Sequence, residues 1–274
     1  MHDVSACRDP WRREREVAAM KPMPWHDLLY SQGFGTRRIC LGLIEQGRVE
    51  VLVHGAWQVL QDPGASIEPE AGMPFRVLGQ PWVYHRLAYL VLHKPAGTEC
   101  SHKPGRWPSI YSLLPDPLRA RPTAGAVQGV QAVGRLDQDT TGLLLLSDDG
   151  AFIHRMASPK HHVPKVYQVR TAQALEPSVP QRLLQGVSLH GERAPVAAAA
   201  ATLTGSHTLE LTLTEGKYHQ VKRMLAALGH EVVQLHRSRM GSLDLPADLA
   251  PGQWRWLTSV ELQRAAAKTN ESPA

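Results

Sequence analysis

Apolar residues in the N-terminal third of the chain follow helical spacing twice and strand spacing once. Trp25, Leu28 and Leu29 recur at helical intervals, and the glycines at 33 and 35 are expected to end that helix. Thr36 can cap a second helix. The apolar face of this second helix is predicted to contain Ile39, Leu43 and Ile44. Valines at 49, 51 and 53 then alternate as a strand that turns back at residues 54–56, which completes a helix-helix-hairpin module.

Prolines and glycines interrupt the chain between residues 61 and 82. Part of this stretch is expected to complete the small module, and the remainder to act as a linker, with a domain boundary near Gln80. Residues 1–22 mix arginines with acidic residues and bury little surface, which predicts a mobile tail. A solvated tail is favoured over an RNA-binding arm.

The rest of the chain, from residue 81 to 264, has the patterns of a mixed α/β domain. Apolar runs and alternations predict strands at residues 88–93, 131–134, 142–147, 166–170, 196–203, 208–214 and 232–236. Helices are predicted to begin near Asp149, Ser178 and Tyr218. Residues 265–274 are expected to form a disordered tail.

Charge and hydropathy narrow the class of partner. Lys and Arg number 30 against 25 Asp and Glu, a net charge of +5. This excess favours an anionic partner, and nucleic acid over a membrane. No segment approaches the roughly 18 apolar residues that span a bilayer, and the N-terminal segment lacks the apolar run of a signal peptide. We therefore expect a cytoplasmic protein without membrane association.

Cysteines and histidines give no sign of a metal centre. Cys7, Cys40 and Cys100 are widely spaced, which argues against both a disulfide framework and a metal-ligand pair. His161 and His162 are adjacent and lack partners at zinc spacing, so a loop or RNA-facing role is favoured for them. We expect no metal.

The segment most informative about chemistry is residues 134–150, which read GRLDQDTTGLLLLSDDG. A strand enters a polar turn here and an apolar strand leaves it. This pattern places the carboxylates of Asp137 and Asp139 at the rim of a sheet, where catalytic side chains are commonly displayed. Taken alone, however, such a pair is more often a turn former whose side chains accept backbone hydrogen bonds.

Four ordered segments resemble the motifs of the RsuA/RluB branch of the pseudouridine synthases. They are HKPAG at 93–97, the segment 134–150, KVY at 165–167 and EGKYHQVKRM at 215–224. The last is followed by LHR at 235–237 and MG at 240–241. The resemblance implies an α+β protein whose catalytic domain has a mixed, mostly antiparallel sheet flanked by helices. It also implies an enzyme that isomerises uridine to pseudouridine in RNA.

Residues 23–80 resemble the S4 RNA-binding domain, which typically precedes this catalytic domain. The resemblance lies in QGFGTRR at 32–38 and LIEQGRV at 43–49. The chain departs from the usual S4 pattern at 24–27, which read PWHD where Arg-Leu-Asp-Lys is common, and at 53–55, where Val-His-Gly replaces Val-Asn-Gly. The module is expected to bind RNA through Arg37, Arg38 and Arg48.

The family reaction cuts the bond between uracil N1 and ribose C1′, rotates the base and joins C1′ to C5. Both reacting partners belong to one substrate, so the resemblance implies neither cofactor nor metal. Asp137 is carried over as the catalytic carboxylate, acting at ribose C1′ or at uracil C6. Arg135 and Val221 are expected to contact the flipped nucleotide. Tyr167 is expected to pack its ring on the target base, with a core tyrosine as the alternative.

Lys222 is the cation of the third motif. It borders an apolar helical stripe that includes Val221, so its long stem can pack while its ammonium reaches Asp137 and keeps that carboxylate ionised. Arg223 points away from the stripe and is expected to face phosphate. The predicted RNA-binding set around it comprises Lys165, Lys217, Arg223 and Arg237, with Arg239 beside them. Glu231 is the only acidic residue expected near this cluster.

The substrate implied by this resemblance is ribosomal RNA. The third motif and SPKHH at 158–162 favour the subgroup that acts on 16S RNA, in a small-subunit assembly intermediate, with the protein as a monomer. One alternative is a 23S enzyme of the same branch. Another is a non-catalytic RNA-binding assembly protein, which loss of the Asp, the Tyr or the third-motif cation would have favoured.

Overall fold

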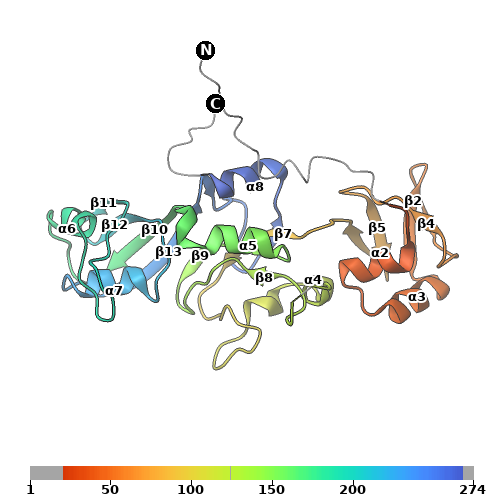
Figure 1. The fold of residues 1–274 in the computed structure, drawn as a ribbon, viewed down its shortest axis with the longest axis horizontal. Helices are drawn as coiled ribbons and strands as arrows, with labels where there is room; N and C mark the ends of the chain where they lie inside the picture. Colours follow the sequence, from red (N-terminus) through yellow and green to blue (C-terminus); the bar gives the residue numbers. More distant parts are fainter. Residues whose placement is uncertain (1–20, 124, 268–274) are drawn as a thin grey trace, which may run out of the picture. The chain divides into compact units, whose positions relative to one another are not determined.

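The computed structural model describes residues 21–123 and 125–267 of the chain. They divide into two compact units (Figure 1). The first contains the chain up to Arg86 together with residues 116–129, and the second contains residues 87–115 and the chain from Val130 onward. The expected tail at residues 1–22 lies outside the described residues, apart from residues 21 and 22. No helix in the described part is long and apolar enough to cross a membrane.

Two helices and two small sheets form the part of the first unit that ends at Arg86. Helix α2 (Trp25–Gln32) ends at Gly33, whose φ of 91° is left-handed and suits a residue without a side chain. Helix α3 (Arg37–Glu45) begins as predicted, because the Thr36 hydroxyl accepts a hydrogen bond from the amide of Ile39. A four-stranded antiparallel sheet has the order β3, β2, β5, β6. The strands of this unit are β1 (Met23–Pro24), β2 (Val49–Val53), β3 (Ala56–Val59), β4 (Ser66–Ile67), β5 (Pro74–Val77) and β6 (Gln80–Val83).

Two expectations for this unit are wrong. Residues 74–83 form β5 and β6 and extend the sheet of the hairpin, so they are not a linker. The prolines and glycines around them mark tight turns between short strands, a pattern that also suits a linker. Ile39 is 54% exposed, whereas Cys40 and Ile44 are buried. These two lie four positions apart on one helical face, about 100° of rotation away from Ile39.

A segment from later in the chain completes the first unit. Residues 116–129 contain α4 (Asp116–Ala120) and Arg121, whose side chain is buried. The Arg121 guanidinium donates hydrogen bonds to Gln32 Oε1 at 3.0 Å and to the carbonyl oxygens of His85 and Arg86 at 2.9 and 3.0 Å. These bonds satisfy a buried charge. The structure therefore differs from the expected continuous division at residue 80, because the first unit runs to Arg86 and includes this returning segment.

One large sheet organises the second unit, in the order β11, β12, β10, β13, β9, β7, β15. Only β13 and β9 pair in parallel among these neighbours, so the expected mixed, mostly antiparallel sheet is confirmed. The strands are β7 (Tyr89–Lys94), β9 (Thr141–Ser147), β10 (Lys165–Thr171), β11 (Ala200–Gly205), β12 (Thr208–Leu213), β13 (Val232–Met240) and β15 (Trp254–Trp256). Two short strands lie beside this path, β8 (Gln131–Ala132) on β9 and β14 (Leu243–Asp244) on β13.

Helices of the second unit pack against this sheet. Helix α5 begins at the predicted place, because the Asp149 carboxylate accepts hydrogen bonds from the first amides of the helix. Helix α8 continues two residues into the expected disordered tail, where Ala265 and Ala266 are buried. A capping box formed by Thr258 and Glu261 starts α8. The helical segments are η1 (Ile110–Leu113), α5 (Gly150–Ala157), η2 (Pro159–His161), α6 (Val179–Gln185), α7 (Gln220–Ala226) and α8 (Ser259–Ala266).

Candidate active site

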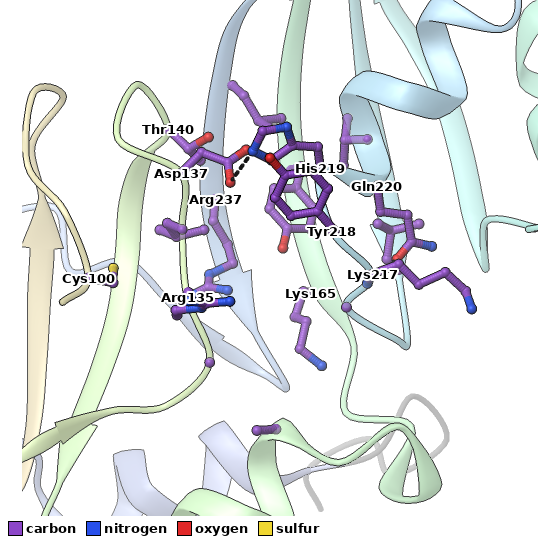
Figure 2. Close-up of a pocket in the computed structure, with 18 of the residues that line it drawn as sticks. Cys100, Arg135, Asp137, Thr140, Lys165, Lys217, Tyr218, His219, Gln220 and Arg237 are labelled. Atoms are coloured by element: carbon purple, nitrogen blue, oxygen red, sulfur yellow. Dashed lines mark hydrogen bonds and ion pairs between the residues drawn. The ribbon is translucent and has the colours of Figure 1, made fainter. Parts of the chain in front are cut away.

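A pocket of about 550 Å³ lies in the second unit (Figure 2). The turn before β9, strands β10 and β13 and the segment leading into α7 all contribute to its wall. Most of the predicted site residues line this pocket: Arg135, Asp137, Lys165, Tyr167, Lys217, Val221 and Arg237. Lys222 and Arg223 are not part of its lining, although both follow Val221 on α7.

The turn that carries Asp137 is held by its backbone. The amide of Thr140 donates to the carbonyl oxygen of Asp137 at 3.1 Å, and the amide of Gly97 donates to that of Gln138 at 2.8 Å. The Asp137 side chain instead faces the side chains of His219 and Lys222. His219 Nε2 lies 3.2 Å from Oδ1, and Lys222 Nζ lies 3.3 Å from Oδ2. This placement suits chemistry in the pocket better than the turn-forming role that was the alternative.

Lys222 bridges two carboxylates. Its predicted pairing with Asp137 is present, but its ammonium is closer to Asp139, at 2.6 and 2.8 Å from the two oxygens. Burial opposes the charge of Lys222, yet the hydrogen bonds to Asp139 and the charge of Asp137 together raise its pKa. Burial also opposes ionisation of Asp139, but Lys222 lowers the pKa of that carboxyl. Lys222 therefore carries its positive charge between two acidic groups.

His219 is a site residue that the sequence patterns did not indicate. It precedes α7 with a φ of 47°, a left-handed conformation that costs energy for any residue other than glycine. Its ring stacks on that of Tyr218, with centroids 3.8 Å apart and an angle of 18° between the planes (Figure 2). The sequence signal that could have identified His219 is its position three residues before Lys222, since residues three apart share a face at the start of a helix.

Lys165 and Arg237, both predicted to bind RNA, are buried in the pocket wall rather than exposed on the outer surface. Lys165 donates to the carbonyl oxygen of Val163 at 2.8 Å, and burial, reinforced by the charge of Arg237, lowers its pKa to about 8. Arg237 Nε donates to the carbonyl oxygen of Leu143 at 2.8 Å. Its Nη2 has no hydrogen-bond partner among the described residues. These two side chains place positive charge inside the pocket.

Close approach of β9 and β13 brings Arg237 beside the catalytic turn. Gly142 pairs with Arg237 in the parallel register of these strands and has a φ of 107°. A Cβ atom at Gly142 would collide with the backbone of Arg237. Tyr167 pairs with Arg237 from the other side, on β10, and its side chain is largely buried in the pocket wall. The glycine therefore lets a carboxylate, a guanidinium and an aromatic ring gather in one pocket.

The other residues predicted to contact RNA lie beside acidic side chains of the second unit or in the first unit. Lys217 and Arg223 both contact Glu192, and Lys217 also lies near Glu215, so Glu231 is not the sole acidic neighbour of this cluster. In the first unit, Arg38 and Arg48 are exposed. Arg37 donates to Asp27 at 2.5 Å, and its guanidinium lies 4.2 Å from the centre of the Tyr30 ring.

This arrangement can bind a planar, polar ring and act on it with a carboxylate. The aromatic ring of Tyr167 and the apolar side chain of Val221 supply flat and apolar surface in the pocket wall. Asp137 presents an oriented carboxylate, and Lys165 and Arg237 supply positive charge for an anionic substrate. In the described part of the chain, no cluster of three His, Cys, Asp or Glu side chains is placed to hold a metal ion.

Comparisons with known proteins agree on one family. The model of the family described as RNA pseudouridylate synthase matches residues 88–227. Ribosomal small subunit pseudouridine synthase A of Pasteurella multocida is 39% identical over 231 residues, which cover 83% of this chain and 92% of the relative. The protein of that name in Escherichia coli K12 is 36% identical over 237 residues, covering 86% and 97%. A crystal structure of a pseudouridylate synthase aligns with a TM-score of 0.60 and 32% identity, over 89% of this chain and 99% of that one.

Proposed function

The chain belongs to the RNA pseudouridylate synthase family, and we propose that it converts a uridine of 16S ribosomal RNA into pseudouridine. The observation that carries this proposal is the Asp137 carboxylate, oriented by His219 and Lys222 in a pocket that Tyr167 also lines. The relatives named for the small ribosomal subunit support the choice of substrate, as do the segments 158–162 and 215–224.

The reaction rearranges bonds within one nucleotide. The bond from N1 to C1′ breaks, a bond from C5 to C1′ forms, N1 gains a proton and C5 loses one. Asp137 is the group that acts on the substrate, at C1′ or at C6 of the uracil. A nucleotide in a helix cannot present these atoms, so the target must first leave its stack and enter the pocket. Holding the base and the carboxylate in fixed geometry then makes each step unimolecular.

Other pocket residues position the nucleotide and the carboxylate. Tyr167 packs its ring against the flipped uracil, and Val221 adds apolar contact. Arg135 is exposed at the pocket and holds the flipped conformation through its charge. Lys222 and His219 fix the orientation of Asp137 through its two oxygens. Lys165 and Arg237 attract the phosphates that accompany the base.

The first unit is proposed to be an S4-like module that binds ribosomal RNA outside the pocket. Arg38 and Arg48 are exposed on α3 and at the start of the hairpin, and Arg37 has 62% of its side chain exposed beside Asp27. Folded RNA is recognised largely through its backbone and shape, which suits such a surface. We propose that the protein acts as a cytoplasmic monomer on an assembling small subunit.

One genetic experiment tests the substrate. Pseudouridines are mapped in 16S and 23S RNA from a strain lacking this protein, with and without the wild-type gene or the Asp137→Asn gene. Loss of a single 16S site, restored only by the wild type, is expected. Loss of a 23S site would instead assign the 23S alternative. An unchanged map would favour a non-catalytic RNA-binding protein.

A further inference from the structure

A closed loop between α6 and β11 places Glu192 beside the start of α7. Val187 and Val196 close the loop by exchanging backbone hydrogen bonds of 2.8 and 2.9 Å, and both side chains are buried. Leu189 is buried as well, and its carbonyl oxygen accepts a hydrogen bond of 3.1 Å from the amide of Glu192. The base of the loop is therefore anchored in the second unit, and Glu192 is presented from its tip.

The Glu192 carboxylate joins two cations with its two oxygens. Oε2 lies 2.9 Å from Lys217 Nζ, and Oε1 lies 3.5 Å from Arg223 Nη1. The exposed fractions of the three side chains are 23%, 32% and 28%, so solvent and ligands can reach the cluster. One carboxylate thus bridges a lysine and an arginine that the sequence patterns assigned to RNA.

The two cations have further partners that hold them in place. Lys217 lies 3.7 Å from Glu215, which also accepts a hydrogen bond of 3.1 Å from the side-chain Nε2 of Gln220. Arg223 donates to the carbonyl oxygens of Tyr218 and His190. Carbonyl oxygens orient a guanidinium without cancelling its charge. Departure of Glu192 would therefore leave a prearranged pair of cations with a net positive charge.

A phosphodiester group fits the position that the Glu192 carboxylate occupies between Lys217 and Arg223. It offers two non-bridging oxygens that share one negative charge, and arginine and lysine are the side chains that most often bind such a group. Lys217 lines the pocket and extends away from the Asp137–His219 pair (Figure 2). Arg223 is not among the residues that line the pocket. A phosphate between them would belong to the RNA strand next to the flipped nucleotide rather than to the target base.

Building on the function proposed above, we propose that Lys217 and Arg223 form a binding site for one backbone phosphate of the substrate RNA. In the free protein Glu192 fills this site, and the RNA phosphate displaces it on binding. Glu192 thereby lowers the affinity for RNA in general, because every RNA must compete with a carboxylate that is already in place. Exchange of one anion for another at the same two cations requires no change in the rest of the fold.

The test is the Glu192→Gln variant, binding to transcribed 16S RNA over a range of salt concentrations. The amide keeps the size of the side chain but removes the competing charge. The dissociation constant at low salt is expected to fall about fivefold, the scale of an exposed ion pair. The logarithmic salt slope should steepen by about 0.7, the value for one phosphate in single-stranded nucleic acid. Glu210→Gln, an exposed carboxylate on β12 with the same change in net charge, is the matched control.

Two outcomes would overturn the phosphate site. One is a Glu192→Gln protein that binds with the affinity and slope of Glu210→Gln while melting at the wild-type temperature. The other is a gain in affinity that persists after Lys217→Gln and Arg223→Gln are added, since the gain must act through these cations. Single-turnover pseudouridine formation by the wild type is measured on the same RNA. Its absence would refute the proposed function, whereas the phosphate site is judged from the affinities alone.

Discussion

The ammonium of Lys94 donates a 2.9 Å hydrogen bond to the carbonyl oxygen of Thr140, from a side chain with no solvent exposure. It also donates to the carbonyl oxygens of Gln138 and Pro95, at 3.2 and 3.1 Å. Burial lowers the pKa of Lys94, and three carbonyl oxygens offset part of the cost of its charge. These bonds tie the end of β7 to the turn that carries Asp137, so Lys94 is a positioning residue.

Replacing Lys94 with Met is expected to slow product formation at least tenfold with little effect on RNA affinity. The turn loses the donor that fixes two of its carbonyl groups, and the unfolding free energy should fall by about 1–3 kcal/mol. Single-turnover rates and urea denaturation measure the two effects. A variant that loses RNA binding in parallel with its rate would contradict a role confined to the turn.

Asp137→Asn is expected to abolish pseudouridine formation while the dissociation constant for RNA stays within about twofold of the wild type. Asparagine keeps the shape but cannot act as an anionic nucleophile or base, and phosphate contacts supply most of the affinity. Product is measured in a single turnover at saturating enzyme. A rate near that of the wild type would remove Asp137 from the chemistry.

Lys222→Met is expected to slow pseudouridine formation more than Asp139→Asn does. Loss of Lys222 removes one of the two side chains that orient Asp137 and leaves the carboxylates of Asp137 and Asp139 without its charge, so the rate should fall by more than about tenfold. Loss of the Asp139 charge leaves Lys222 free to pair with Asp137, so the rate should fall less. Combining both changes should cost little more than Lys222→Met alone. Equal, additive losses would show that Asp139 acts independently of Lys222.

RNA binding is expected to weaken as pH rises from 7 to 9, because Lys165 loses its proton in this range. Its pKa is about 8, so its charge in the pocket is present at pH 7 and mostly absent at pH 9. The dissociation constant should rise roughly tenfold, the scale of a hydrogen bond to a charged group. Lys165→Met should bind more weakly at pH 7 and converge with the wild type at pH 9. Parallel curves for the two proteins would place the titrating group elsewhere.

The same shift has a consequence for stability. Unfolding returns Lys165 to its ordinary pKa of 10.5, so the unfolded chain binds more protons than the folded chain between pH 8 and 10.5. The contribution of Lys165 to the unfolding free energy therefore rises with pH across this window. Denaturation at pH 8 and pH 10 should show that rise in the wild type relative to Lys165→Met. A constant difference between the two proteins would contradict the lowered pKa.

Neutralising Arg37, Arg38 and Arg48 together with glutamine should raise KM for 16S RNA severalfold while kcat stays near the wild-type value. The pocket residues remain, and only phosphate contacts are removed, so the salt slope should also become shallower. Substitution is a cleaner test than deletion of residues 1–86, since that deletion would take away the hydrogen-bond partners of the buried Arg121. Unchanged KM and salt slope would show that this surface does not dock the substrate.

Local chemistry made much of the fold predictable from the sequence. The cap at Thr36, the break at Gly33 and the apolar strand predicted at 142–147 depend on neighbours in the chain, and each is present. Strands β5 and β6 were missed because they are short and bounded by turn residues. Among site residues, Asp139 was missed as a partner of Lys222, since the two lie 83 positions apart and only the sheet brings them together. Arg237 is buried because β13 runs through the middle of the sheet, which its sequence position does not reveal.

The return of residues 116–129 to the first unit sets an order for the chain during its synthesis. Gln32 and the carbonyl groups of His85 and Arg86 leave the ribosome before Arg121, which is their hydrogen-bond donor. At about 5–20 residues per second, translation leaves a gap of a few seconds between Arg86 and Arg121. In that interval β7, with Lys94, is already made while the older unit still lacks its last segment. The two units therefore cannot complete their folding strictly one after the other. A pause in translation between Arg86 and Arg121 would prolong the time in which the first unit is incomplete.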